Sequence, residues 1–335
     1  MSVIDIVTPT WLKTRYLYGI DLTDDEGIEF PDDLFSHSID SAASILESDL
    51  DIVLTGNRQY VERRDTVDFH TESFFLMHMD HRPMQSVDAI TVQFGDYPSA
   101  TLPVSWAQVD NHKAGQVQIL PGPEGIGSII FGGTVPFLGL SGLYGRPYTP
   151  LWFKFTYTAG FESELEGTVD VTVGGTTVTG TDTYFKKPFN SPAYKGGQYK
   201  GGFYTTVLPG HYVEINDEVK RVVKVKSDTV FEVDSAFAAT STGNTVELYA
   251  YPPAILDAVG LLGAMLPLDT AGDLIVGAGI ASKSFSVDGL STSINTTASS
   301  TNAGYGARML SYKNRLKDLL KSIRRDYRLP NMAIL

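Results

Sequence analysis

Residues 281–304 form a nearly uncharged tract that limits how this chain can fold. Of these 24 residues, 18 are Ser, Thr, Asn, Gly or Ala, and only Lys283 and Asp288 carry a charge. So little apolar area cannot offset the entropy that is lost when such a segment becomes ordered. Compact domains also keep the connections between their helices short. The tract therefore favours a subunit of an assembly, in which a partner supplies the missing contacts.

The segments on either side of this tract are both predicted helices. Residues 252–266 read as an apolar helix, and residues 308–327 read as a basic amphipathic helix whose apolar residues recur every three or four positions. Its cations are Arg308, Lys313, Arg315, Lys317, Lys321, Arg324 and Arg325. Such a helix packs on its own domain, binds a partner groove or lies on a membrane surface. The membrane is the weakest of the three, because the apolar stripe has no Trp or Phe.

The net charge of −13 is unevenly divided along the chain. Residues 308–328 hold eight Lys or Arg and two Asp, which is 8 − 2 = +6, so the remainder carries −13 − 6 = −19. Residues 21–51 alone contain eleven carboxylates and no Lys or Arg. An acidic body repels phosphate and disfavours general nucleic-acid binding. The charged regions are either solvated faces, or a basic arm and an acidic region that meet across subunits.

Bulk composition is that of a globular protein. The 335 residues suffice for one large domain or two modest ones, and 42% are hydrophobic. With no cysteine, the chain has no disulfide or thiolate metal site, which favours synthesis in a reducing cytoplasm. We find no apolar run of membrane-spanning length, and the first residues, MSVIDIVTPTWLK, do not resemble a secretory signal.

Periodicity divides the chain into helical and extended regions. Helices are predicted from Pro9, with Thr8 as N-cap, and over residues 31–50. Alternating patterns then predict strands, at 89–94, 104–109, 115–120 and 151–158. From about 167 to 249 the pattern is purely extended, with hairpin turns such as Gly174-Gly175.

We therefore predict an α+β fold. Residues 1–165 and 251–335 would form a discontinuous helical core with additional β-strands, containing the N-terminal helices and two C-terminal helices. Residues 166–250 would be an inserted all-β domain resembling a small barrel, since the chain on either side of the block could be joined directly. Residues 281–304 would be ordered on assembly, and 308–335 would form the basic helix and tail.

No catalytic, metal or cofactor site is expected. Asp68, His70, His78, Asp80 and His81 are the densest group of metal-ligand residue types, but His78 and His81 would face opposite ways on a strand. The Gly-rich run at 277–284 lacks the second Gly of a phosphate loop. A glycosidase carboxylate pair stays open as an alternative, since sequence alone does not place carboxylates together.

Several short motifs resemble one family in their order. They are Val61-Glu-Arg-Arg-Asp65, His81-Arg-Pro83, Phe155-Thr-Tyr-Thr-Ala-Gly-Phe161, Ala271-Gly-Asp-Leu-Ile275, Ala278-Gly-Ile-Ala-Ser-Lys-Ser284, Val287-Asp-Gly-Leu-Ser291 and Thr301-Asn-Ala-Gly-Tyr-Gly306. Together they are similar to the head–tail connector proteins of tailed bacteriophages, also called adaptor or head-completion proteins. The resemblance covers about 1–162 and 252–328, and it is most specific at 271–306.

The resemblance implies a structural virion protein, made in the bacterial cytoplasm and located in the neck. Copies, typically twelve, would form a ring below the portal protein, meet tail or neck proteins, and continue the channel through which DNA passes. DNA would be only the contents of this channel, and no membrane, cofactor or catalytic residue is implied. The expected interface comprises the seven cations of the last helix together with Phe285, Val287, Leu290 and Ile294. A different tail or receptor-binding component is the main alternative.

Overall fold

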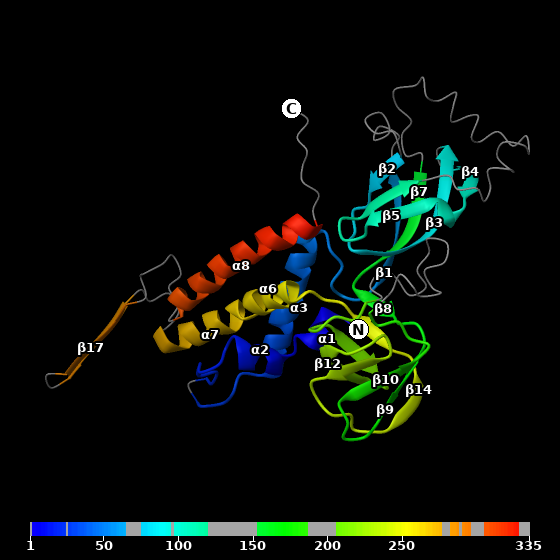
Figure 1. The fold of residues 1–335 in the computed structure, drawn as a ribbon. Coiled ribbons are helices and arrows are strands. Elements are labelled where there is room, and N and C mark those ends of the chain that lie inside the picture. Colours follow the sequence, from blue (N-terminus) through cyan, green and yellow to red (C-terminus); the bar gives the residue numbers. More distant parts are fainter. Residues whose placement is uncertain are drawn as a thin grey trace, which may run out of the picture. The chain divides into compact units, whose positions relative to one another are not determined.

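The computed structural model describes residues 2–24, 26–64, 75–94, 97–119, 153–186, 206–276, 282–287, 290–295 and 305–327 (Figure 1). It divides into two compact units. Unit 1 contains residues 1–50, 252–326 and 330–335, and unit 2 contains 51–251 and 327–329. Most of the ordered secondary structure is antiparallel β-sheet. The predicted helical adaptor core is therefore wrong, and the fold is mainly β.

Unit 1 is built from helices. They are α1 (Val3–Ile6), α2 (Pro9–Arg15), α3 (Asp32–Leu50), α6 (Pro253–Gly263), α7 (Met265–Val276) and α8 (Gly306–Tyr327). The predicted start of α2 is confirmed, because the Thr8 hydroxyl accepts a hydrogen bond from the Trp11 amide at 3.2 Å and Pro9 is the first helical residue. Local capping signals thus determine where this helix begins.

Helix α3 is central to unit 1. Its buried residues include Phe35, Ile39 and Leu46, and it packs against α1, α2, α6 and α7. The buried Ser38 hydroxyl donates to the Gly263 carbonyl of α6 at 2.6 Å. At Gly260 a Cβ atom would lie 2.5 Å from the Tyr16 ring, so the absent side chain lets α6 approach α2 closely. The apolar stripe of α3 and the small residues of α6 explain this packing.

Unit 1 also contains one β-hairpin. Strands β16 (Ser282–Val287) and β17 (Leu290–Asn295) pair antiparallel over their whole length, from Ser282 opposite Asn295 to Val287 opposite Leu290. They form a two-stranded sheet (Figure 1). The sequence between the strands is Asp288-Gly289, which is typical of a two-residue hairpin turn. The hairpin lies within the predicted tract 281–304, whose ordering on assembly stays a prediction.

The described residues of unit 2 form three sheets. A four-stranded sheet has the order β1 (Arg58–Arg64), β7 (Phe153–Ala159), β3 (Met84–Phe94) and β4 (Tyr97–Leu102). A three-stranded sheet has the order β2 (Phe75–His78), β6 (Gln116–Ile119) and β5 (Ala107–Asn111), with the 3-10 helix η2 (Val104–Trp106) preceding β5. The predicted strands near 89–94, 115–120 and 151–158 are confirmed, whereas 104–109 begins with this helical turn.

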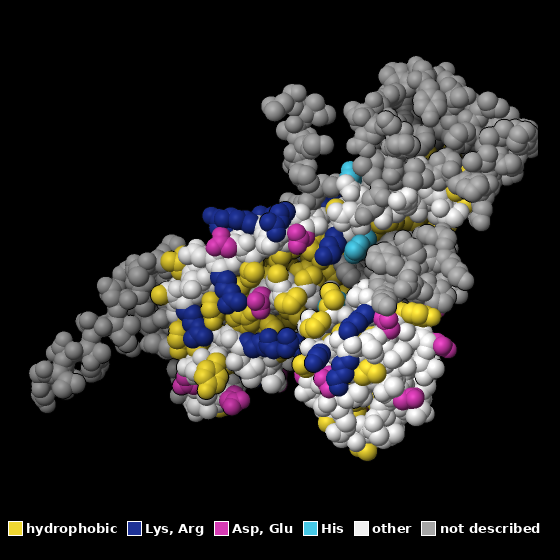
Figure 2. Space-filling model, in the orientation of Figure 1, with side chains coloured by type: hydrophobic (Ala, Val, Ile, Leu, Met, Phe, Trp, Pro, Cys, Tyr) yellow, Lys and Arg dark blue, Asp and Glu magenta, His cyan; other side chains and the backbone are white. Residues whose placement is uncertain are grey.

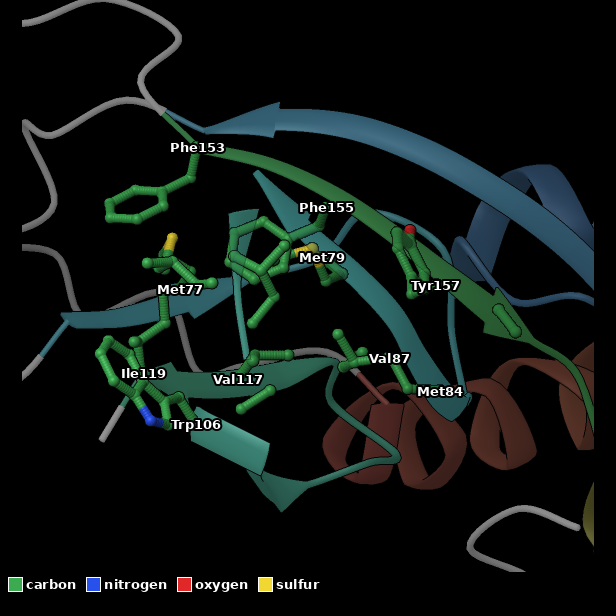
Figure 3. Close-up of a cluster of buried hydrophobic side chains, with 14 of the residues drawn as sticks. Met77, Met79, Met84, Val87, Trp106, Val117, Ile119, Phe153, Phe155 and Tyr157 are labelled. Atoms are coloured by element: carbon green, nitrogen blue, oxygen red, sulfur yellow. The ribbon is translucent and has the colours of Figure 1, made fainter. Parts of the chain in front are cut away.

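One hydrophobic core joins these two sheets. It draws Phe153, Phe155 and Tyr157 from β7, Met77 from β2 and Val117 from β6, among others, and each is at most 1% exposed (Figure 3). Strand β7 is buried at every second residue, as expected for a strand that presents one face to a core. The two sheets therefore pack face to face.

The remaining strands form an eight-stranded sheet that closes on itself. Its order is β14 (Ser241–Asn244), β9 (Thr168–Val171), β10 (Thr177–Thr181), β13 (Val230–Val233), β12 (Glu218–Val225), β11 (Tyr212–Ile215), β15 (Glu247–Tyr249) and β8 (Glu162–Glu164). Strand β14, at one end of this order, continues along the chain into β15, which pairs with β8. Strand β8, at the other end, continues into β9, which pairs with β14. Between the β14–β9 and β15–β8 pairs, the Leu165 amide donates to the Val246 carbonyl at 2.9 Å. The closed sheet surrounds a second hydrophobic core that includes Val178, Val222 and Phe231.

The error in fold class has a physical cause. The signals that mark a helix lie within a few residues of one another. The pairing of β1 with β7 instead joins residues far apart in the sequence, with Arg58 opposite Ala159. Strand β1 has the sequence RQYVERR, in which polar residues occupy the half-buried face, so it lacks the apolar alternation that marks a strand. Separate folding of residues 166–250 stays a prediction, because 51–251 form one unit.

Candidate interaction surface on the C-terminal helix

Helix α8 has one apolar side and one charged side, as the sequence predicts. Met309, Ile323 and Tyr327 are buried, and Leu316, Leu319 and Leu320 are partly buried. Lys and Arg side chains gather over the part of the surface where Figure 1 draws α8 (Figure 2). The structure divides the seven predicted interface cations of this helix into two groups.

Three arginines bind groups of unit 1 itself. Arg324 forms two hydrogen bonds to the Asp49 carboxylate of α3, at 2.7 and 2.6 Å. Arg315 pairs with Asp257 of α6 at 3.2 Å, and Arg308 donates to the Tyr16 carbonyl at 2.9 Å. The guanidinium group carries five N–H donors and stays charged, which suits contacts with carboxylates and carbonyls. These contacts hold α8 to its own unit, and a role of the three arginines in binding a partner stays a prediction.

Tyr16 connects two of these contacts. Its hydroxyl donates to Asp257 at 2.8 Å, and its carbonyl accepts from the Tyr312 hydroxyl at 2.5 Å. Burial raises the pKa of Tyr16 above its usual value, and the hydrogen bond to Asp257 raises it further. Sequence reasoning missed this group, because residues 16, 257 and 312 are brought together only by the packing of three helices.

Four cations remain on the outer side of α8. Lys313, Lys317, Lys321 and Arg325 follow one another at intervals of four residues and are all exposed. Lys321 and Arg325 pair with nearby carboxylates of α8, Asp318 at 3.1 Å and Asp326 at 3.8 Å. Residues four apart lie on the same side of a helix, so these cations form a row about 18 Å long. We call these four residues the basic row.

The four apolar residues predicted for the interface lie on the β16–β17 hairpin. Phe285 and Val287 belong to β16, and Leu290 and Ile294 belong to β17. The backbone register places Val287 opposite Leu290 and Phe285 opposite Thr292. Directly opposite residues share a face, so all four apolar residues occur on one face of the ribbon.

Comparison with known proteins gives no family. The chain matches no protein-family model. No curated protein matches it. Among the described residues no group of three or more His, Asp or Glu residues could hold a metal ion; of the sequence candidates, Asp68 and His70 lie outside the described residues. The function has to be inferred from the chain itself.

One described helical stretch, Pro253–Leu274, is long and apolar enough to cross a membrane. The sequence analysis missed it, because Asp257, Asp269 and Asp273 interrupt the run. Within the protein, 61% of its most apolar window is buried. Core helices of folded proteins have the same length and composition, so this is weak evidence for a membrane span.

A second polar cluster, in unit 2, was not predicted. The Glu62 side chain is 11% exposed and accepts from Arg64 at 2.6 Å, from the Asp80 amide at 3.1 Å and from the Tyr157 hydroxyl. His81 Nδ1 lies 2.8 Å from the same carboxylate, and its ring stacks on Tyr60 at 3.7 Å. The sequence signal that could have indicated this cluster is the spacing of Tyr60, Glu62 and Arg64, which places them on one face of a strand. Both oxygens of the Glu62 carboxylate have partners, and the Tyr157 hydrogen bond to one of them fastens β1 to β7.

Two half-buried histidines of unit 2 have lowered pKa values. Burial, followed by the charge of Lys113, lowers the pKa of His112 to about 4 and that of His211 also to about 4. The His211 Nδ1 atom lies 3.3 Å from the Leu208 amide and accepts its hydrogen bond, which requires the unprotonated nitrogen. Both side chains are therefore neutral in the folded protein at neutral pH.

We expect unit 2 to lose stability as the pH falls from about 6.5 to 4. Between these two pH values a histidine is protonated in the unfolded chain but stays neutral in the folded chain. Each histidine therefore lowers the free energy of unfolding by about 1.4 kcal/mol for each pH unit of the fall. Thermal unfolding between pH 7.5 and 4.5 measures the effect. The double variant His112→Gln, His211→Asn should show a flatter dependence on pH, and equal slopes would contradict the assignment.

Proposed function

We propose that this chain is a structural subunit of the head–tail neck of a tailed bacteriophage, where copies of it form a ring and bind the portal protein. The proposal concerns a mainly β protein with a helical unit, and it assigns no catalytic residue. The ring, of about twelve copies, would continue the DNA channel and carry tail or neck proteins. The family resemblance of the short motifs is one support, and the exposed surface is the other.

The single observation that carries the proposal is the basic row of α8. Four cations lie exposed on one side of a helix whose other side is fixed to its own unit by Arg308, Arg315 and Arg324. A helix held in this way presents its outer cations in a fixed spacing. Such a row suits carboxylates of a partner protein, and complementary charge accelerates docking and selects the partner.

Three of the seven motif segments behind the resemblance also meet in the structure. Glu62 and Arg64 of the first motif contact His81 of the second and Asp80 beside it, and Tyr157 of the third donates to Glu62. Residues that are distant in the sequence thus form one structural network. These contacts support a scaffold role for the motifs, because they join three segments of unit 2 through paired side chains.

The second candidate function is another tail or receptor-binding component of a virion. The predominance of β-sheet, including the closed eight-stranded sheet, favours it. This candidate predicts no affinity for a portal protein. Electron microscopy of virions that carry an affinity-tagged copy of the chain decides between the two. Label at the neck supports the proposal, and label at the tail tip or fibres would overturn it.

Replacing the basic row should weaken binding to the portal protein. In the variant Lys313→Gln, Lys317→Gln, Lys321→Gln, Arg325→Gln, we expect at least a tenfold loss of affinity and a smaller dependence on salt, because exposed ion pairs contribute up to about 1 kcal/mol each. Titration of portal rings across a salt series measures both.

Arg324 provides the matched control for this experiment. It lies on the same helix but binds Asp49 of its own unit. Arg324→Gln should therefore lower the thermal stability of unit 1 and leave the salt dependence of portal binding unchanged. If the control weakened binding as much as the fourfold variant, the basic row would not be the binding surface.

A further inference from the structure

The β16–β17 hairpin has two chemically different faces. Its backbone register puts Lys283, Phe285 and Val287 on the same face as Leu290, Thr292 and Ile294. The other face holds three serines of β16 and Ser291, Ser293 and Asn295 of β17. We call the first the mixed face and the second the serine face. Because only the mixed face carries large apolar side chains, we expect another protein surface to pack on that face and the serine face to stay in water.

Within the described part of the chain, β16 and β17 pair only with each other. An isolated two-stranded hairpin is marginally stable in water, and burial of an apolar face is what usually stabilises it. Four of the six residues on the mixed face are large and apolar. The hairpin therefore needs a surface that supplies apolar contact and, beside Lys283, negative charge.

Unit 1 carries such a surface in the turn that follows α2. Tyr18 is 79% exposed and Ile28 is 59% exposed, the two largest exposures among the apolar residues described in unit 1. A small antiparallel turn fixes Ile28, because Thr23 bridges to Glu29 and the Asp24 amide donates to the Ile28 carbonyl at 2.8 Å. We call residues 18–29 the acidic turn.

Charge favours contact between these two surfaces. Five carboxylates lie in the acidic turn and none of its residues is Lys or Arg, whereas the only charged residue in the two hairpin strands is Lys283. The exposure of Tyr18 and Ile28 also means that the chain's own hairpin does not cover them. A second copy of the chain can supply the missing partner to both surfaces.

We propose that the mixed face of the hairpin in one copy docks on the acidic turn of the next copy. The two surfaces differ, so the contact is heterologous, and repetition of it produces a ring when the rotation closes. The inference rests on the proposed function, since it names the contact between neighbouring copies within that ring. The serine face then remains turned away from the neighbour.

The absence of cysteine allows a clean cross-linking test. Chains carrying Glu26→Cys are mixed with full-length chains carrying Thr292→Cys, which places one thiol on the acidic turn and one on the mixed face. Under mild oxidation we expect the mixed disulfide to exceed the statistical yield at least fivefold. The matched control is Ser293→Cys, one residue further along β17 and on the serine face. Equal yields from positions 292 and 293 would overturn the proposal.

Self-association provides a second measurement. The double variant Phe285→Asp, Ile294→Asp should weaken self-association at least tenfold, as measured by sedimentation velocity. The control variant Ser284→Asp, Ser293→Asp changes the charge of the same strands equally and should leave self-association unchanged. Equal effects of the two pairs, or a wild-type chain that stays monomeric at every concentration, would overturn the hairpin contact. The proposed function fails separately, if the tagged chain is not found at the virion neck.

Discussion

Replacing Gly160 with alanine is expected to destabilise unit 2 by about 3 to 5 kcal/mol, because overpacking and backbone strain add. Gly160 has a φ of 147°, and a Cβ atom there would lie 2.1 Å from the Asn57 side-chain oxygen and 2.9 Å from the Asn57 Cα. Asn57 is not free to withdraw, since its side chain donates to the Glu162 carbonyl at 2.9 Å and accepts from the Glu162 amide at 3.2 Å.

Gly160 is also fixed by its own hydrogen bonds. Its amide donates to the Pro83 carbonyl at 2.9 Å, and its carbonyl accepts from the buried Gln85 side chain at 2.7 Å. Urea unfolding followed by circular dichroism measures the loss. Gly243→Ala is the control, because Gly243 has a φ of 70° with no atom within 4 Å of the added Cβ. It should cost about 1 kcal/mol from backbone strain alone. Similar costs at both glycines would contradict the packing argument.

The helices of unit 1 could be predicted because their signals lie within a few residues. Thr8 and Pro9 mark the start of α2, and the apolar period of 31–50 marks α3, which the structure places at Asp32–Leu50. Strands in the region of the closed sheet could be predicted for a similar reason. Short turns such as Asn216-Asp217, both with positive φ, separate strands that pair with their sequence neighbours.

The mainly β architecture could not be predicted in the same way. Strand β1 precedes its partner β7 by about ninety residues, and its half-buried residues Tyr60, Glu62 and Arg64 are polar. Such a strand is stable only because partners from other elements satisfy its polar groups. Sequence reasoning counted local helical signals, and it therefore assigned too much of the chain to a helical core.

The candidate surface shows the same limit. Composition identified α8 as basic, but it could not separate Arg324, which binds Asp49, from Lys317, which is exposed. That separation depends on which carboxylates the packing of α3 and α6 brings near the helix. The hairpin is different. Its apolar and serine residues alternate over a short stretch of sequence, and the register specifies which of them share a face.

The polar cluster around Glu62 gives the second large prediction. Glu62→Ala is expected to lower the free energy of unfolding by about 3 kcal/mol, because removal of one member of a mostly buried charged group leaves the others without compensation. Arg64 would keep only Asp80, at 2.8 Å, and the Tyr157 hydroxyl would lose its acceptor. Burial raises the pKa of Tyr157, and the Glu62 hydrogen bond raises it further, so the hydroxyl stays a donor to the carboxylate.

A double-mutant cycle with Tyr157→Phe tests whether this loss belongs to the cluster. Because Tyr157 and Glu62 share a hydrogen bond, the double variant should be more stable than the sum of the single losses predicts. Val61→Ala is the control, since Val61 neighbours Glu62 on β1 but is 57% exposed, and it should change stability by less than about 0.5 kcal/mol. Urea unfolding of the four variants measures each value. A cost for Glu62→Ala as small as that for Val61→Ala would show that β1 is held by its backbone ladder alone, and additive losses would show that Tyr157 and Glu62 act independently.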